Sequence, residues 1–261
     1  MSAFLVVADS SGKSLSRKHL YAMMDKLSHR GPDGSDSVYF NNVFLSHYHL
    51  WITPEEVEER QPLNNGSGSL FIIFDGRLDN RDELINLINP ANKELENKSD
   101  ASLLLLLYEI LGDKSFEKLI GPYSVVIYDK NRKRVICARD PLAERGFFFH
   151  INKNLFIASS EEQAILSHPE VSKTLNEKNI AHYFAIEALR DGSTFFKDIR
   201  ELLPGHILIF ENKKAAAKKF HEFKPLRIRY GDDGEYAEHY RELLEKSVAC
   251  RMRCSTPASI T

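Results

Sequence analysis

The chain has 261 residues, 43% of them hydrophobic, and a formal net charge of -2. This length and composition allow one large domain, or one domain and part of a second, with a sizeable core. The near-neutral charge excludes a general electrostatic attraction to nucleic acid or to a membrane surface. The three cysteines do not make a disulfide framework in a chain of this length, so we expect a reducing, cytoplasmic location.

Neither a signal peptide nor a membrane span is expected. Residues 4–8 are apolar, but this run is too short for a signal peptide and lacks a basic lead. Residues 103–107 are also apolar, yet a membrane span requires roughly 20 such residues. The second run is typical of a buried helix.

Strand-like and helical segments alternate in the first half of the chain. Apolar or alternating runs predict strands and a hairpin, with its turn at Asn41 and Asn42. Apolar residues at helical spacing follow Ser16, which is a favourable N-cap residue. A later helix has Ser99 or Asp100 as its expected N-cap residue. The predicted strands cover 3–8, 38–50 and 70–74, and the predicted helices cover 16–27, 79–88 and 99–111.

The second half contains short strands in hairpins with helices between them. This arrangement predicts antiparallel sheets covered by helices, not a doubly wound parallel sheet. A basic turn, 213–214, follows the last predicted strand. The predicted strands cover 123–128, 134–138, 147–150, 155–158 and 207–210, and the predicted helices cover 162–167 and 178–186.

The last part of the chain has a different pattern. Residues 223–234 are polar and contain a proline, which is typical of a linker. Residues 236–252 have the spacing of an amphipathic helix, and its apolar face needs a partner. The residues of that face are Tyr240, Leu243, Leu244, Val248 and Met252. We therefore expect more chain beyond Thr261.

Short motifs occur along the chain in a characteristic order. The most informative are the first residues, Met1-Ser2-Ala3-Phe4, and the turn Phe74-Asp75-Gly76-Arg77-Leu78-Asp79-Asn80. The others are Ser28-His29-Arg30-Gly31-Pro32-Asp33-Gly34, Ser46-His47-Tyr48-His49-Leu50, Gln61-Pro62-Leu63, Ser99-Asp100, Gly121-Pro122-Tyr123, Ala138-Arg139-Asp140-Pro141 and Leu203-Pro204-Gly205-His206. Their order and spacing resemble the N-terminal glutaminase domain of asparagine synthetase-type amidotransferases.

The resemblance implies an α+β fold of the N-terminal nucleophile (Ntn) hydrolase type, a four-layer αββα sandwich of two antiparallel sheets between helices. It further implies a glutaminase-like domain over 1–222, a linker over 223–234, and the first helix of an ATP-dependent synthetase domain over 235–261. That domain would use ATP and Mg, and no cofactor is expected for the part present. Expected partners are the synthetase domain, glutamine or another small amide or amine, and a second copy in a homodimer.

The resemblance places the reaction at the N-terminus. In the family a cysteine follows the initiator methionine, its thiolate attacks the glutamine amide, and its α-amine handles the proton. Ser2 takes this position, and its small side chain permits removal of Met1. A hydroxyl is a poorer nucleophile than a partly ionised thiol. Ser2 is therefore a variant nucleophile, an inert residue at the start of a strand, or an engineered replacement of cysteine.

Asp75 and Gly76 take the place of the Asn-Gly pair that forms the family's oxyanion hole. Asparagine donates a hydrogen bond there, whereas Asp75 is an acceptor with a negative charge. Loss of one such donor costs roughly 2.7–4 kcal/mol in the transition state. Gly76 retains the turn.

Three further positions correspond to substrate contacts in the family. Arg77 replaces a glutamate, and His49 replaces the arginine that grips the α-carboxylate. Asp100 matches the aspartate that meets the α-ammonium group. We therefore predict a glutaminase-like domain with a disabled hydrolysis site, in an amide ligase that uses ammonia or another amine.

Two alternative functions stay open. The first is a non-enzymatic metabolite-binding or scaffold module, in which Asp75 and Arg77 form a salt-bridged plug or a new ligand site. The second is a hydrolase of a different amide, with Ser2 as nucleophile. His47 and His49 share one face of a strand, as zinc ligands would, but no third ligand is evident, so no metal site is predicted.

Overall fold

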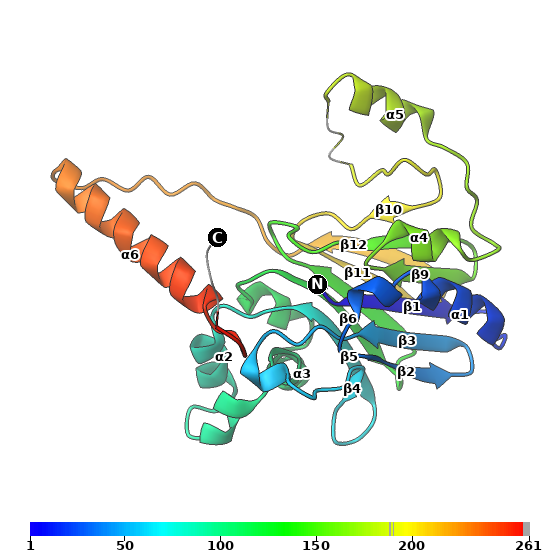
Figure 1. Ribbon diagram of the computed structural model, residues 1–261, viewed down its shortest axis with the longest axis horizontal. Helices are drawn as coiled ribbons and strands as arrows, with labels where there is room; N and C mark the ends of the chain where they lie inside the picture. The colour runs from blue at the N-terminus through cyan, green and yellow to red at the C-terminus, as the bar shows by residue number, and fades with distance from the viewer. Residues whose placement is uncertain (188, 190, 258–261) are drawn as a thin grey trace.

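The computed structural model describes residues 1–187, 189 and 191–257 (Figure 1). The strands are β1 Ala3–Asp9, β2 Ser35–Phe40, β3 Val43–Tyr48, β4 Leu63–Asn64, β5 Leu70–Gly76, β6 Tyr123–Asp129, β7 Arg134–Arg139, β8 Phe148–Ile151, β9 Leu155–Ser159, β10 Arg200–Glu201, β11 His206–Glu211 and β12 Lys214–Lys219. The α-helices are α1 Arg17–Asp25, α2 Arg81–Ile88, α3 Asp100–Leu111, α4 Glu162–Leu166, α5 Glu177–Phe184 and α6 Asp233–Arg251. None of the helices in this described part combines the length and the apolar character that a membrane span requires.

Within the described residues, the strands form two antiparallel sheets of six strands each. The first sheet has the order β10-β8-β9-β1-β3-β2, and the second has the order β12-β11-β7-β6-β5-β4. In the first sheet, Val6 of β1 lies opposite Leu45 of β3 and Ala158 of β9. In the second sheet, Asp75 of β5 lies opposite Ser124 of β6. The predicted antiparallel arrangement is confirmed.

Clusters of apolar side chains hold together four layers of secondary structure: two sheets and the helices on their outer sides. Because side chains alternate along a strand, one set from each sheet faces the other sheet, and Phe4 of β1 shares this inner cluster with Ile73 of β5. Leu104 of α3 packs with Ile72 on the outer side of the second sheet. On the outer side of the first sheet, α1 and α4 contribute the cluster that contains Met23. These layers form the predicted four-layer αββα sandwich (Figure 1).

The sequence pattern missed β12, the edge strand of the second sheet. The prediction of a turn at 213–214 is wrong by one position, because Lys214 already pairs with Glu211. The turn residues are Asn212 and Lys213, with positive φ values of 52° and 64°, as a two-residue hairpin turn requires. β12 consists of lysine and alanine and is mostly exposed, so it has no apolar alternation that predicts a strand.

Other differences between the sequence prediction and the structure concern the ends of helices. α1 ends at Asp25, and Leu27 lies beyond the helix although it is still fully buried. Ser16 occupies the N-cap position of α1 without a side-chain capping hydrogen bond. Ser99, by contrast, caps α3, because its Oγ accepts a hydrogen bond from the Ser102 N–H at 3.1 Å.

α6 extends away from the sandwich for most of its length, and its C-terminal end returns to lie near α2 (Figure 1). Residues 220–232 form no helix or strand before it. The Asp232 side chain caps α6 by accepting a hydrogen bond from the Glu235 N–H at 3.1 Å. The predicted apolar face is exposed, with Tyr240 at 67% and Leu243 at 56%.

Candidate active site

A polar cluster lies where the first residues meet β3 and β5, at one end of the space between the sheets. Ser2 is two residues before Phe4, so it shares the face of the chain that points to the second sheet. Ser2, His47, His49 and Asp75 line a common cavity of about 20 Å³. A volume of this size accommodates about one water molecule. Met1 also lines this cavity, so the volume is that of the chain with Met1 in place.

A second cavity, of about 300 Å³, lies on the other side of Met1 and Gly76, which line both cavities. Arg77 lines only this second cavity, while Ser2, His49 and Asp75 line only the first. Asp100 lines neither of the two. The structure therefore does not bring the predicted residues together in one space.

Asp75 is a buried acid at the end of β5, and its side chain is shielded between the sheets. Burial raises the pKa of Asp75 from 3.8 to about 6, while the positive charges of Arg145, Arg30 and the N-terminal amine lower it. Burial lowers the pKa of the N-terminal amine, and Asp75 raises it. At neutral pH the ionised form of Asp75 predominates. The position that the sequence resemblance assigns to a neutral hydrogen-bond donor is therefore occupied by an acid.

Gly76 lies at the end of β5, opposite Tyr123 of β6. A Cβ atom at Gly76 would be 2.2 Å from the carbonyl oxygen of Pro122 and 2.6 Å from the Cα of Tyr123. Only glycine fits this position, because both neighbours are backbone atoms. The Arg77 N–H then donates to the Pro122 carbonyl at 2.9 Å, which fixes the turn after the strand.

The predicted plug of Asp75 and Arg77 is wrong. In the described part of the chain, the carboxylate partner of Arg77 is Asp79, at 3.1 Å from Nε to Oδ1. The cations that act on Asp75 are Arg145 and Arg30. The turn after Gly76 explains the separation, because it takes Arg77 out of the space between the sheets.

His49 is fully engaged in hydrogen bonds. Its Nε2 lies 3.0 Å from Asp36 Oδ2, and its Nδ1 lies 2.9 Å from His47 Nδ1. If His49 donates to Asp36, its Nδ1 accepts from His47, and His47 Nε2 is left as an acceptor. His47 Nε2 is buried and has no hydrogen-bond partner. Burial lowers the pKa of His47 to about 3, with His49 adding to the effect.

Asp100 is the first residue of α3 and is completely buried. Its Oδ2 accepts hydrogen bonds from the Leu78 N–H and from Arg253 Nη2, each at 2.7 Å. Its Oδ1 accepts from Arg81 Nη1. Two guanidinium groups therefore already neutralise the carboxylate that meets the α-ammonium in the family.

Several functional neighbours were not predicted from the sequence. Arg145 and Glu59 line the small cavity, and burial raises the pKa of Glu59 to about 7 against the effect of hydrogen bonds from Ser99 and Gln61. Gln61 was visible as part of a motif, and its Oε1 accepts from the Phe74 N–H at 2.7 Å. No local sequence pattern marks Arg145 or Glu59 as a residue of the site. In the described residues, no group of three or more potential metal ligands is suited to a metal ion.

A family model described as a glutamine amidotransferase domain matches residues 1–221. The chain is 27% identical to the putative asparagine synthetase [glutamine-hydrolyzing] 2 of Methanocaldococcus jannaschii, over 94% of this chain and 51% of that protein. It is 30% identical to asparagine synthetase [glutamine-hydrolyzing] 3 of Bacillus subtilis, over 72% of this chain and 31% of that protein. The chain therefore spans about half, or less, of these relatives.

The fold matches a solved amidotransferase. The glutamine phosphoribosylpyrophosphate amidotransferase of B. subtilis, complexed with ADP and GMP, gives a TM-score of 0.59 over 85% of this chain and 49% of that chain. The sequence identity is 18%, so this likeness concerns the fold alone.

Proposed function

We propose that this chain, which belongs to the glutamine amidotransferase domain family, is the glutaminase-like part of an asparagine synthetase-related amide ligase. We further propose that it does not hydrolyse glutamine. The observation that supports this proposal is Asp75, a buried carboxyl group at the position that the sequence resemblance assigns to the oxyanion-hole asparagine. Glutamine hydrolysis develops negative charge on the amide oxygen, and an anion beside it raises the barrier.

Two further features support the loss of hydrolysis. Ser2 supplies a hydroxyl in place of the family thiol, and His49 uses both ring nitrogens within the protein. Together, these features leave the substrate without a strong nucleophile and without a contact for its carboxylate.

The nitrogen for amide formation would then be free ammonia or an amine of another substrate. ATP and Mg would act in a synthetase domain of a longer protein, of which this chain is one part. A cytoplasmic location and a homodimer remain expectations of the same proposal.

Glutamate release from glutamine tests the proposal directly. We expect no release by the parent and measurable release by a Ser2→Cys/His49→Arg/Asp75→Asn/Arg77→Glu variant. The matched control carries the same substitutions except that Asp75 is retained, and we expect it to be inactive. Release by the parent at a rate similar to that of the four-residue variant would refute the proposal.

One observation favours a second candidate, a hydrolase of a different amide. His47 Nε2 is buried and has no hydrogen-bond partner among the described residues, and His47 and Ser2 line one cavity, so the hydrogen-bonded series Asp36–His49–His47 and the Ser2 hydroxyl border a common space. An acyl electrophile would then modify Ser2, and His47→Gln would suppress the reaction while His29→Gln would not. An unmodified N-terminal peptide in the mass spectrum would exclude this candidate.

A further inference from the structure

We propose that the outer part of the family's glutamine pocket has become a socket for the end of α6. The socket consists of Glu55, Arg77, Asp79, Asp100 and Glu144. Its occupant is the C-terminal segment, residues 250–255 of the same chain. This proposal goes beyond the loss of hydrolysis, because it assigns a binding role to Arg77 and Asp100.

The first contact is between Arg77 and the last carbonyl groups of α6. Arg77 Nη2 donates to the Cys250 carbonyl, and Nη1 donates to the Arg251 carbonyl at 3.2 Å. Carbonyl groups at the end of a helix lack partners within it and carry partial negative charge. The positive charge of Arg77 stabilises this end, whereas the glutamate of the family would repel it.

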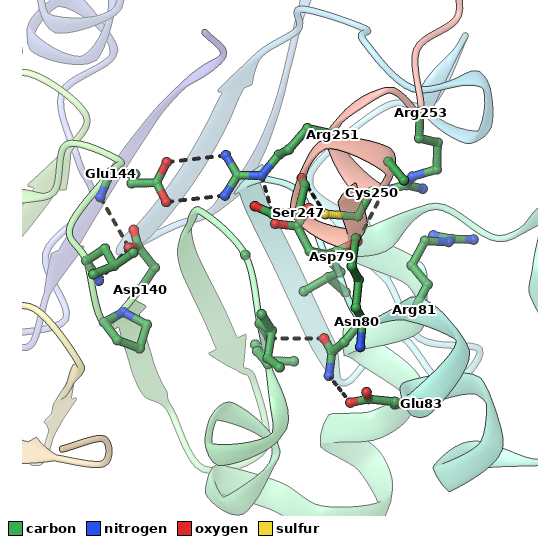
Figure 2. Close-up of a pocket in the computed structure, with 18 of the residues that line it drawn as sticks. Asp79, Asn80, Arg81, Glu83, Asp140, Glu144, Ser247, Cys250, Arg251 and Arg253 are labelled. Atoms are coloured by element: carbon green, nitrogen blue, oxygen red, sulfur yellow. Dashed lines mark hydrogen bonds and ion pairs between the residues drawn. The ribbon is translucent and has the colours of Figure 1, made fainter. Parts of the chain in front are cut away.

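The second contact joins Arg251 to the sandwich. Its Nε lies 2.9 Å from Asp79 Oδ2, and its terminal nitrogens lie 3.4 and 3.5 Å from the Glu144 carboxylate. Figure 2 shows the Arg251 guanidinium between Asp79 and Glu144. Asp79 thereby bridges Arg251 and Arg77, since it also accepts from Arg77.

The third contact is deeper and involves Arg253. Its Nη2 lies 2.7 Å from Asp100 Oδ2, and its Nη1 lies 3.0 Å from Glu55 Oε2. Burial alone would lower the pKa of Arg253, but Asp100 and Glu55 raise it overall. Arg253 thus presents a cation to the carboxylate that meets the substrate's α-ammonium in the family. Charge-assisted hydrogen bonds in such partly buried pairs are stronger than those on an exposed surface.

The segment continues across the socket after Arg253. The Ser255 N–H donates to the Ile52 carbonyl at 2.7 Å, which adds a backbone contact on the far side. Apolar packing contributes little along α6 itself, because Leu244 and Val248 are about half exposed. A space of about 750 Å³ lies between the helix and the sandwich. We infer that charged and backbone hydrogen bonds, rather than apolar contacts, hold the end of α6.

Hydrogen exchange of the purified chain, followed by mass spectrometry, tests the socket. We expect Arg77→Glu and Arg253→Gln each to accelerate amide exchange over 250–255 by about tenfold or more, because each removes contacts that close this segment. The matched control is Arg241→Gln on the same helix, whose carboxylate partners are Glu238 and Glu245 on α6 itself. Unchanged exchange over 250–255 in both socket variants would overturn the proposal.

A chemical rescue keeps the test decisive if one variant folds poorly. Exchange over β1 and β6 reports whether each variant is folded. In folded Arg253→Ala, added ethylguanidinium should restore slow exchange over 250–255, whereas ethanol at the same concentration should not. Exchange that is fast with and without ethylguanidinium would refute a guanidinium-specific socket. These measurements use no glutamine, so their failure and a failure of the proposed loss of hydrolysis are distinguishable.

Discussion

The inner and outer parts of the candidate site, around Asp75 and around Asp100, differ in how charge is balanced. In the inner part, Asp75 and His47 are buried with little compensation, and burial shifts their pKa values in the direction of the neutral forms. In the outer part, Asp100 and Arg253 compensate each other through hydrogen bonds. The stability of the inner part should therefore depend mainly on pH. The stability of the outer part should depend mainly on salt and on substitution of either member of an ion pair. The candidate site thus contains two kinds of electrostatic environment.

The largest expected effect is the removal of the outer carboxylate. Asp100→Ala leaves the buried guanidinium of Arg81 and the end of Arg253 without their shared partner, so we expect the free energy of unfolding to fall by about 3–5 kcal/mol. Urea unfolding measures this change. Glu238→Ala is the control, since its exposed pair with Arg241 should contribute less than about 1 kcal/mol. Equal losses of unfolding free energy in both variants would contradict the distinction between buried and exposed ion pairs.

The next largest effect is expected at Asp75. Its pKa is higher in the folded state than the ordinary value of 3.8, so its contribution to stability is fully present below about 4 and is lost as the pH rises through about 6. Above that range, ionisation in the folded state costs about 3 kcal/mol.

Asp75→Asn should therefore be more stable than the parent above pH 6, by up to about 3 kcal/mol, with the difference decreasing toward pH 4. Urea unfolding across this pH range measures the difference. Asp82→Asn, at an exposed position of α2, is the control and should follow the parent. A pH-independent difference between Asp75→Asn and the parent would contradict the inner-pocket description.

A smaller effect is expected at the helix that carries Asp100. Ser99→Ala removes the capping hydrogen bond to the Ser102 N–H, together with the hydrogen bond from Ser99 to Glu59, and should cost at least about 1 kcal/mol of unfolding free energy. Ser16→Ala is the matched control, because Ser16 is also at an N-cap position but makes no such bond. Thermal or urea unfolding of both variants distinguishes them. A similar loss of stability in Ser16→Ala would show that a serine at the N-cap position, and not its capping hydrogen bond, determines the loss.

The smallest effect is expected from salt. Between about 0.05 and 1 M NaCl, screening should accelerate exchange over 250–255 by about two- to fivefold, because part of the socket is open to solvent. Exchange over β1, which is buried between neighbouring strands, serves as the internal reference. Exchange that is independent of salt over 250–255 would argue that backbone contacts, such as that of Ser255, dominate the docking.

Local patterns in the sequence predicted most of the fold. Strands such as β5 are apolar on both faces because both sheets and helices cover them, and that composition is visible in the sequence. β12 lacked this signal because it lies at an exposed edge, where lysine and alanine suffice. Ser99 was recognisable as a cap because capping depends on residues that are close in sequence.

The candidate site was only partly predictable. The motif around Asp75 indicated its position in the family pocket, but its pKa depends on burial, which no local pattern determines. The partner of Asp100 was not predictable either, because Arg253 is 153 residues away in the sequence. The pair of His47 and His49 was visible as strand periodicity, yet their mutual hydrogen bond follows from side-chain packing.

The composition of β12 also has a consequence for assembly. An edge strand exposes unpaired backbone groups to which another strand can add, and lysines on such an edge oppose this addition. Lys214, Lys218 and Lys219 are all exposed on β12. Two copies brought together along this edge would repel each other, so continuous sheet formation across two molecules is disfavoured there. A homodimer of this protein should therefore use a different surface.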